Sequence, residues 1–524
     1  MTRPPFVQRR PFLVTAVILV LTVCVAGGSA VYVFTDPGFT ESLDLFRTAL
    51  LINRLYEHEV NWDDLVKGGM DGMFSKLDRY SSYVEPRRWD RMHEELSGSY
   101  TGIGVSVIED ERGLMIMSVR EDGPAAAAGI LNGDIVTKVD TVSLAGLDVY
   151  ESTEVLRGPD GSDVRLGLYR PSVDDTLSVV VRRRKINFVH IPYAGLTPDS
   201  CVYVRLLDFD AGAHRDLQAA IDSLLADPPY EPYGFILDLR GNPGGLFVEA
   251  YQTANLFLEA DRFIVGTDGR SRWEEEQFKS TGPDITGGMP MAVLVDNGSA
   301  SAAEIVSGAL QQEGRAILIG DTTFGKGLVQ GYRRLHDGSG VRLTVSRYYL
   351  DGPLYLNEFD STLEDVGHGL VPDILVDLPE EHPFVRALER SLLLGKFVEI
   401  HQDEILGKSG GFELDDDWVE RFHDFARAEG FVYRSSITRA AEALGEIARA
   451  NDAGKRFKRD IEAFLKTSRA DDTGEFTNRA DYIKSRLVQL ATERKYGLSI
   501  AYRDAIVPNR PDIHIAAQVL RSRE

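Results

Sequence analysis

Cysteine is the scarcest residue in this chain of 524 residues, which contains only Cys24 and Cys201. Cys24 lies in an apolar N-terminal segment and Cys201 in a strand-like run without a nearby histidine motif, so we expect neither a structural disulfide nor a thiol nucleophile. The ten histidines include no H-E-x-x-H pattern and no paired Cys/His spacing. We therefore predict that the protein uses no metal and no cofactor.

Positive charge is also in deficit. The chain has 58 Lys and Arg against 81 Asp and Glu, which gives a formal net charge of −23 and an isoelectric point of about 5.0. This balance argues against DNA or RNA as a partner, because nucleic-acid-binding proteins carry basic surfaces. The length predicts several domains with ample apolar core.

Long apolar runs are absent except at the N-terminus, where residues 12–34 are long enough to span a bilayer. Three arginines within residues 1–11 precede the run and predict that this stub is cytoplasmic and the remainder extracytoplasmic. We favour a retained transmembrane anchor. The alternative is a signal peptide that is cleaved near residues 28–30.

Residues 293–330 contain the strongest indication of chemistry. An apolar strand ends in a polar turn, Ser301 follows, and the small and apolar residues after it continue at helical spacing. A second short strand leads, 25 positions after the serine, to Lys326 between two glycines. An enclosed lysine loses solvation, so its pKa falls and it can act as a base near neutral pH. Because a serine needs such a base to become a nucleophile, the pair indicates a Ser–Lys hydrolase.

Two other interpretations of these residues were weighed. Ser301 and Glu304 form an S-x-x-E capping box, and a cap is compatible with a nucleophile because free N–H groups at a helix start stabilise an oxyanion. Residues 320–327 nearly match a phosphate-binding loop. Gly327 stands where that loop needs a hydroxyl, and residues 328–335 look like a strand where it needs a helix.

The motifs G-S-A-S-A-A-E-I around Ser301 and T-F-G-K-G-L-V-Q around Lys326 closely resemble those of the carboxyl-terminal processing proteases, tail-specific Ser–Lys peptidases. The resemblance covers roughly residues 40–376. It implies that Ser301 is the nucleophile, that Lys326 is the general base, and that Gln330 orients the lysine. Independently, Gln330 lies four positions after Lys326, an even step that would place both side chains on one face of a strand.

A buried strand ends at Asp238 in the glycine-rich turn D-L-R-G-N-P-G-G, which matches the D-L-R-x-N-x-G-G motif of the family. The resemblance implies that backbone N–H groups form an oxyanion hole; the candidates are Gly244, Gly245 and Ala302. We expect Asp238 and Arg240 to be a structural pair that fixes this turn. The implied fold for residues 187–378 is an α/β core of ββα units, similar to the ClpP and crotonase folds.

Residues 99–186 alternate short strands with glycine turns and resemble a PDZ domain. Such a domain captures a peptide's terminal carboxylate on successive backbone N–H groups, and the peptide then adds as a strand. The candidate binding residues are Gly102, Ile103, Gly104 and Val105. Arg157, just after the predicted groove helix, is either a gating contact between this domain and the core or a solvated helix-end charge. The alternative for the domain is that it only packs within its own chain.

Two helical regions flank these parts. Residues 40–98 resemble the segment that precedes the PDZ domain in the family, where it packs between subunits or against the core; the alternative is an isolated amphipathic hairpin. Residues 379–524 form a helical extension without a catalytic motif. We interpret the extension as a docking or assembly domain, for a homo-oligomer or an adaptor.

Together these features predict a serine endopeptidase that processes or degrades proteins from their C-terminal ends outside the cytoplasm. Its substrates would be unstructured protein C-termini. The resemblance implies a single-pass protein of a bacterial cell membrane, with the catalytic domain on the periplasmic side. The second hypothesis is a PDZ scaffold with an inactive peptidase core. Intact Ser301, Lys326 and Gln330 favour the first.

Overall fold

The structure is a computed structural model of the chain. It describes residues 37–120, 122–171, 173–226, 231–270, 275–351, 354–359, 365–376, 382–407, 414–451 and 454–523. The predicted stub at residues 1–11 and the predicted anchor at residues 12–34 lie outside this part. Within it, no helix combines the length and the apolar character that crossing a bilayer requires.

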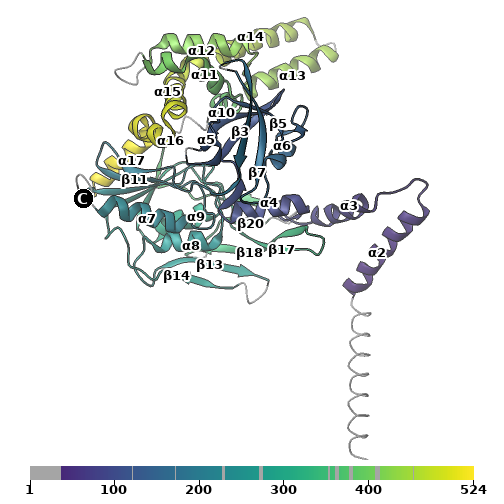
Figure 1. The fold of residues 1–524 in the computed structure, drawn as a ribbon. Coiled ribbons are helices and arrows are strands. Elements are labelled where there is room, and N and C mark those ends of the chain that lie inside the picture. The colour runs from purple at the N-terminus through teal and green to yellow at the C-terminus, as the bar shows by residue number, and fades with distance from the viewer. Residues whose placement is uncertain are drawn as a thin grey trace, which may run out of the picture.

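A mostly parallel sheet forms the centre of the molecule (Figure 1). Its strands, in spatial order, are β10 (Tyr193–Leu196), β11 (Cys201–Arg205), β12 (Gly234–Asp238), β15 (Met291–Val295), β16 (Ala316–Gly320) and β22 (Ile374–Leu375). Only β10 runs antiparallel to its neighbour. Strands β12, β15 and β16 are buried along their whole length, as expected for parallel strands that are covered on both faces.

Helices cover both faces of this sheet. Alternate strand residues such as Val293 share a core with α7 (Ala213–Ala226), α8 (Phe247–Asn255) and α9 (Ala302–Gln312). The intervening residues, such as Leu294, pack instead against α17 (Pro511–Arg521). Sequence analysis placed this last helix in an accessory extension. Its packing shows that it completes the central core, because it covers a face that would otherwise expose apolar side chains to water.

A second sheet is antiparallel and carries the strands around Lys326. Its strands are β1 (Ser82–Val84), β18 (Gly340–Leu350), β13 (Phe263–Gly269) and β14 (Gln277–Lys279), with β17 (Leu328–Arg334) and β19 (Leu354–Tyr355) also paired to β18. A small ribbon of β20 (Asn357–Phe359) and β21 (Asp365–Gly367) follows. Strand β1 comes from residues 40–98, where only helices were predicted, so this region contributes directly to the core.

The region predicted as a PDZ domain forms its own sheet and core. The strands are β3 (Val105–Asp110), β4 (Gly113–Val119), β5 (Ile135–Val139), β7 (Asp163–Arg170) and β8 (Asp175–Arg182), with β6 (Val142–Ser143) paired to β5. Helices α5 (Pro124–Ala127) and α6 (Val149–Leu156) complete it, and the pair β2 (Ser99–Gly102) and β9 (Arg184–Asn187) joins it to the rest of the chain. Strand β3 lies at the edge of the sheet, with one side open to a further strand.

The N-terminal helices divide into two parts. Helices α2 (Pro37–Leu55) and α3 (Trp62–Phe74) project from the body of the molecule (Figure 1), and α3 has no buried residue. Helix α4 (Pro86–Leu96) instead packs on the core, where buried Trp89 lies against Gly340. The predicted helical region is therefore partly an exposed arm and partly a support for the antiparallel sheet.

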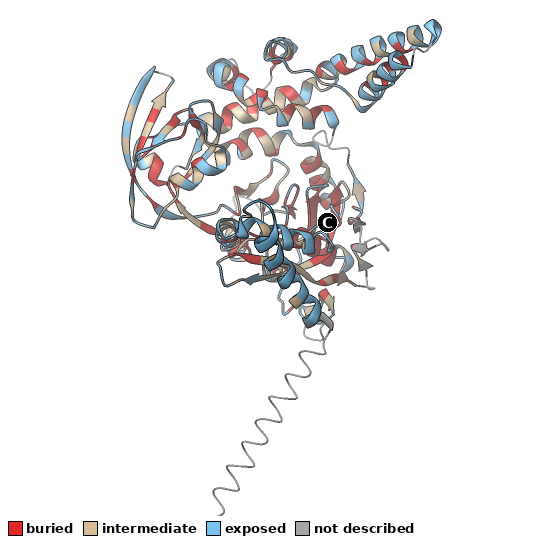
Figure 2. Cartoon of the chain, turned by 90° about the vertical axis from the view of Figure 1, so that its right-hand side faces the viewer, coloured by how far each residue is buried: buried red, intermediate tan, exposed pale blue. Residues whose placement is uncertain are grey.

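The C-terminal helices form a third core. It contains α10 (Pro383–Arg390), α11 (Leu393–Gly407), α12 (Asp416–Ala428) and α15 (Ala480–Tyr496). Helices α13 (Ser436–Ala450) and α14 (Lys455–Asn478) form a largely exposed hairpin that projects from it (Figure 2). A short helix, α16 (Leu498–Ala501), and two irregular turns lead to α17.

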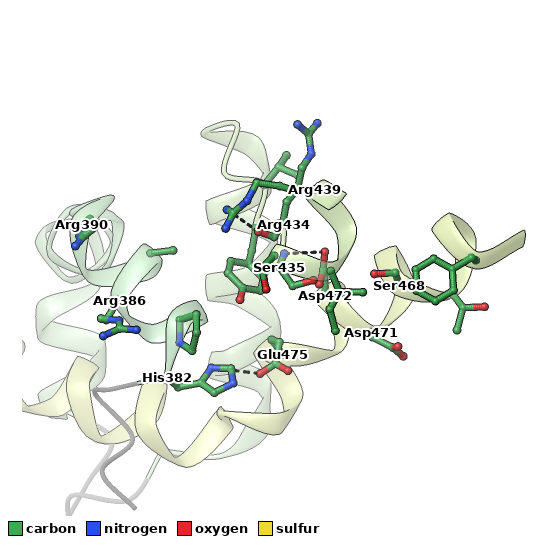
Figure 3. Close-up of a pocket in the computed structure, with 18 residues that line it drawn as sticks. His382, Arg386, Arg390, Arg434, Ser435, Arg439, Ser468, Asp471, Asp472 and Glu475 are labelled. Carbon is green, nitrogen blue, oxygen red and sulfur yellow. Dashed lines mark hydrogen bonds and ion pairs between the residues drawn. The ribbon is translucent and has the colours of Figure 1, made fainter. Parts of the chain in front are cut away.

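A groove of about 1080 Å³ lies between α10 and the α13–α14 hairpin. Figure 3 shows Arg386 and Arg390 on one wall and Asp471, Asp472 and Glu475 on the other. The hairpin side also carries Arg434 and Arg439 and is therefore of mixed charge, whereas the charged side chains of α10 that line the groove are both arginines. None of the predicted catalytic residues lines this groove; they line a separate cavity in the central core.

Candidate active site

Ser301 occupies the sharp turn between β15 and α9. Its backbone angles, φ 56° and ψ −112°, are sparsely populated by residues other than glycine. A serine at such a strand-to-helix turn has the geometry of a nucleophile elbow, which presents the hydroxyl at the start of a helix. The predicted capping box with Glu304 is also present. The structure therefore combines the two interpretations that the sequence left open.

Glu304 ties the serine turn to the lysine loop. Its fully buried carboxylate accepts four hydrogen bonds of 2.6–2.8 Å, from Thr323 Oγ1 and from the backbone N–H groups of Ser301, Gly325 and Lys326. Burial raises the pKa of Glu304, and these four bonds oppose that rise. Sequence analysis saw this residue only as part of a cap, because the lysine loop is distant in sequence.

A second contact joins the same two segments. Tyr348, buried on β18, donates its hydroxyl to the carbonyl oxygen of Ser301 at 3.2 Å and also contacts that of Lys326. Backbone donors and acceptors of both segments are thus held by side chains from α9 and β18. This arrangement restricts the separation of the serine and the lysine.

Lys326 is half-buried between β16 and β17, with its Nζ 5.1 Å from the centre of the Tyr80 ring. Burial lowers the pKa of the Lys326 amine below its ordinary value. Repulsion from the Arg342 guanidinium lowers that pKa further, whereas attraction to Glu304 partly opposes the change. The environment therefore favours a neutral amine, which is the form that can accept a proton.

The two polar atoms of the Gln330 side-chain amide differ in their hydrogen bonding within the described residues. Its Nε2 donates to Thr344 Oγ1 at 2.8 Å, and Thr344 Oγ1 donates in turn to the Asp78 carboxylate at 3.0 Å. Gln330 Oε1 is buried and has no hydrogen-bond partner among the residues that the structure describes. A buried acceptor without a partner is costly, so this oxygen is placed to accept from a nearby donor such as an ammonium group.

Sequence analysis placed Lys326 and Gln330 on one face of a strand because they are four positions apart, and that reason was wrong. Lys326 lies two residues before β17 begins, so it does not share a regular strand with Gln330. The register shift in this pairing skips Val345 of β18 and leaves the alternation along β17 itself uninterrupted. The two side chains nevertheless line one cavity.

The glycine-rich turn after β12 packs directly against the serine turn. A Cβ on Gly244 would lie 2.8 Å from Ser301 Cβ, and one on Gly245 would lie 2.5 Å from the Phe209 backbone, so only glycine fits at either position. The Gly244 N–H donates to Asn242 Oδ1 at 2.9 Å. The Gly244 N–H is thus engaged in this structure, and its predicted role as an oxyanion donor stays a prediction.

Two predicted oxyanion donors remain. Within the described residues, neither the N–H of Gly245 nor that of Ala302 has a hydrogen-bond partner. Ala302 is the first residue of α9, where N–H groups lack partners within the helix. Both residues line the cavity that contains Ser301, so both N–H groups are candidates to bind a developing negative charge there.

The cavity has a volume of about 370 Å³. Polar groups of Ser301, Lys326 and Gln330 meet apolar side chains there, which come from Leu96, Leu246, Phe247, Val248, Ile305, Leu328, Val329, Tyr332 and Tyr348. Within the described part of the chain, no group of three or more His, Cys, Asp or Glu side chains is placed to hold a metal ion. The site thus combines a hydroxyl, a lysine amine and free N–H groups in an apolar enclosure.

Comparison with known proteins identifies the family. Models of peptidase family S41, of the PDZ domain, and of the C-terminal helical domain of a probable PDZ-protease match residues 200–374, 101–181 and 395–520, respectively. The carboxy-terminal-processing protease of Bartonella bacilliformis is 35% identical over 321 residues, 61% of this chain and 71% of that protein. The chain belongs to peptidase family S41. The carboxy-terminal processing protease CtpA of Bacillus subtilis is 32% identical over 372 residues, 70% of this chain and 76% of its own.

The peptidase is accordingly a carboxy-terminal processing serine enzyme with a PDZ domain and a helical C-terminal region, and the predicted family is confirmed. Among solved structures, a photosystem II D1 C-terminal processing protease is 25% identical, with a TM-score of 0.37. That alignment covers 64% of this chain and 93% of the other.

The PDZ domain of the peptidase presents the predicted carboxylate loop between β2 and β3. Gly102 ends β2 and Val105 begins β3, and Gly104 between them has a φ of 80°, which favours glycine. The Ile103 side chain is buried in the domain core, so this residue can contribute to a ligand only through its backbone. The loop lies at the end of the edge strand, where a peptide would add as a further strand.

Arg157 contacts α4 rather than the catalytic residues. Its guanidinium pairs with Glu94 of α4 at 2.5 Å. A further contact joins the same two helices, since the guanidinium of Arg91 on α4 lies 3.7 Å from the centre of the Tyr150 ring on α6. Leu96 at the end of α4 lines the catalytic cavity. Arg157 is thus neither fully solvated nor a direct contact with the core; a single helix separates it from the site.

Sequence analysis missed several supporting residues. Asp78, Ser81 and Thr344 form the hydrogen-bonded support beneath Gln330, and Tyr80 lies beside Lys326. Their only local sign was a polar turn within a helical region. Nothing in that turn indicated a partner more than 200 positions later, since the pairing of β1 with β18 is a tertiary contact.

We expect Glu304→Gln to destabilise the peptidase by about 3 kcal/mol, because an amide has only one acceptor oxygen and leaves about two buried N–H donors unpaired. The midpoint of urea denaturation measures the change. Glu313→Gln at the end of the same helix is the matched control, since its partly exposed carboxylate accepts only bonds of 3.2 and 3.4 Å. Equal midpoints for the two variants would contradict the role of Glu304 as a tie.

Proposed function

We propose that the peptidase hydrolyses peptide bonds near the C-terminal ends of unstructured proteins, with Ser301 as nucleophile and Lys326 as general base. The observation that carries this proposal is the shared cavity, in which a strained serine and a lysine with a lowered pKa are held together through Glu304. Serine activation requires a neutral base within reach. An enclosed lysine amine supplies one without a histidine.

In the proposed reaction, the neutral Lys326 amine accepts the hydroxyl proton while Ser301 Oγ attacks the scissile carbonyl carbon. The carbonyl oxygen becomes an oxyanion, which the N–H groups of Gly245 and Ala302 stabilise. The Lys326 ammonium then protonates the departing amine, and water hydrolyses the acyl-enzyme by the same steps. Gln330 Oε1, an acceptor without a partner among the described residues, orients the ammonium between these transfers.

The PDZ domain would supply the preference for C-terminal ends. A terminal carboxylate would bind to backbone N–H groups of the loop from Gly102 to Val105, and the preceding residues would pair with β3. The segment further upstream would then be free to enter the cavity. The edge position of β3 and the turn at Gly104 support this role.

We also propose that the peptidase acts outside the cytoplasm of a bacterial cell, held by a single membrane span at residues 12–34. The support is the length of that apolar segment and the three arginines before it.

Ser301→Ala is expected to lower peptidase activity by several orders of magnitude while the fold is retained, because it removes the attacking oxygen. Hydrolysis of an unstructured C-terminal tail by residues 37–524 measures this. Ser307→Ala on the same helix is the control, since it removes a buried hydroxyl that has no hydrogen-bond partner among the residues that the structure describes. Wild-type turnover by the Ser301 variant would refute the mechanism. Absence of turnover in the unaltered protein would favour the scaffold hypothesis.

The rate should rise with pH as Lys326 loses its proton, with a midpoint below the free-lysine pKa of about 10.4. Arg342→Gln should move this midpoint upward, because removing a positive charge stabilises the ammonium form and raises the pKa of Lys326. Arg347→Gln is the control on the same strand, where the guanidinium pairs with Asp268 instead. The profile of kcat/KM against pH decides, and a midpoint unmoved by Arg342→Gln would show that another group is titrating.

Amidation of a substrate's C-terminus should lower kcat/KM roughly tenfold to a hundredfold, since a charged acceptor adds about 1.5–3 kcal/mol to a hydrogen bond with N–H donors. Paired peptides that differ only in the terminal group measure the effect. Substitutions far upstream of the cleavage site should have smaller effects. If free and amidated peptides are cleaved at equal rates, the PDZ loop does not capture a carboxylate.

A further inference from the structure

The glycine-rich turn that holds the proposed oxyanion donor Gly245 is anchored by a residue from the opposite end of the chain. Asp512, the second residue of α17, is only 2% exposed and pairs with the guanidinium of Arg240. Arg240 lies within the turn, five positions before Gly245. The last helix of the chain therefore contacts the turn directly, in addition to covering the central sheet.

Arg240 transmits this contact to the backbone of the turn. Its guanidinium also binds the Asp238 carboxylate, with Nε at 2.9 Å, and its own N–H donates to the same carboxylate at 3.0 Å. Both carboxylates are nearly fully buried. The side chain and the backbone of Arg240 are thus both bonded to Asp238, and the side chain also bonds Asp512 of α17.

Asp512 supplies one of the two negative charges that offset the arginines around Arg240. Three guanidinium groups, of Arg205, Arg240 and Arg510, share the two carboxylates of Asp238 and Asp512. These carboxylates keep the pKa of Arg240 above its ordinary value despite burial. Without the charge of Asp512, the cluster would have three cations and a single anion in a region of low dielectric, which is strongly unfavourable.

The structure also provides space for Arg240 to move. A cavity of about 320 Å³ adjoins it at the seam between the core and the C-terminal helices. Asp296 and Glu389 line that cavity, and Glu389 is already paired with Arg486. Asp296 already binds the N–H of Gly241 at 2.6 Å, so a guanidinium that turned toward it would disturb the same backbone segment.

We propose that Asp512 is a positioning residue for the oxyanion turn, so that the C-terminal helix is required for the chemical step. The inference rests on the proposed function, since it assumes that Gly245 stabilises the oxyanion. Asp512 acts through Arg240 and does not touch the substrate. An oxyanion donor is effective only within a few tenths of an ångström of its ideal position, and this explains how a contact outside the cavity affects the rate.

Asp512→Asn should lower kcat by roughly ten- to a hundredfold, because loss of one well-placed oxyanion donor costs about 10²–10³ and a displaced donor costs less. KM for an unstructured tail should change less than about twofold. A peptide aldehyde, whose carbonyl carbon forms a bond with Ser301 Oγ and whose oxygen becomes the oxyanion, should bind more weakly by the same factor as the loss in kcat. Residues 37–524 are used throughout, below the onset of thermal unfolding.

His514→Gln is the matched control on the same helix. His514 pairs with Asp199 of the core at 2.7 Å and lies 2.9 Å from the carbonyl oxygen of Pro508, and among the described residues no hydrogen bond joins it to the turn. If α17 only stabilises the fold, the two variants should lose activity in proportion to their folded fractions, with kcat per folded molecule and aldehyde affinity unchanged. That result, or unchanged aldehyde affinity in Asp512→Asn, would overturn the proposal.

If Asp512→Asn does not fold, a second variant still tests the proposal. Asp512→Glu keeps the charge and displaces the carboxylate by one methylene, so it should fold and still show the selective loss of kcat; an unchanged kcat in this folded variant would overturn the proposal. Ser301→Ala separates the two levels of inference. Residual activity in that variant refutes the proposed mechanism, whereas its inactivity together with unchanged kcat in the Asp512 variants refutes only the positioning role.

Discussion

The buried carboxylate of Glu304 is the interaction on which the geometry of the site depends. It accepts hydrogen bonds from the N–H groups of Ser301 and Lys326, two residues that belong to different strand ends. A carboxylate is well suited to this task, because its two oxygens accept several bonds and no backbone carbonyl could approach both segments at once. The Tyr348 hydroxyl contacts the carbonyl oxygens of the same two residues, so the backbone acceptors of both segments are held as well as their N–H donors. Serine and lysine are thereby fixed relative to each other through their backbones, and the lysine amine is left free for chemistry.

The parallel sheet explains why these segments meet. Ser301 follows β15, the glycine-rich turn follows β12, and the loop to Lys326 follows β16, so all three leave the same edge of the sheet. In parallel sheets this edge gathers functional loops, because every strand ends there. Such a sheet must be covered on both faces. Helix α17 covers the second face of the sheet. This explains why α17 belongs to the central core, although the C-terminal helices before it form a hydrophobic core of their own.

The remaining parts are connected to the site by short paths of polar contacts. Gln330 rests on Thr344 and Asp78, so the N-terminal region supports the lysine side of the cavity. Helix α4 pairs with the PDZ domain through Arg157 and reaches the cavity with Leu96. Each path consists of a few directional contacts between helices and strands of the described chain.

The sequence by itself determined the parts of this protein that local patterns encode. The spacing of Ser301 and Lys326, the glycine turn after Asp238 and the PDZ motifs reflect turn chemistry and hydrophobic periodicity, which act within a few residues. The family and its architecture followed from these patterns. Only the tertiary structure decided which donors are engaged and which side chains meet: the Gly244 N–H bonds Asn242, and Gln330 rests on Thr344 of the neighbouring strand. It also decided that α17 completes the core, because contacts between residues hundreds of positions apart depend on how elements pack and not on local sequence.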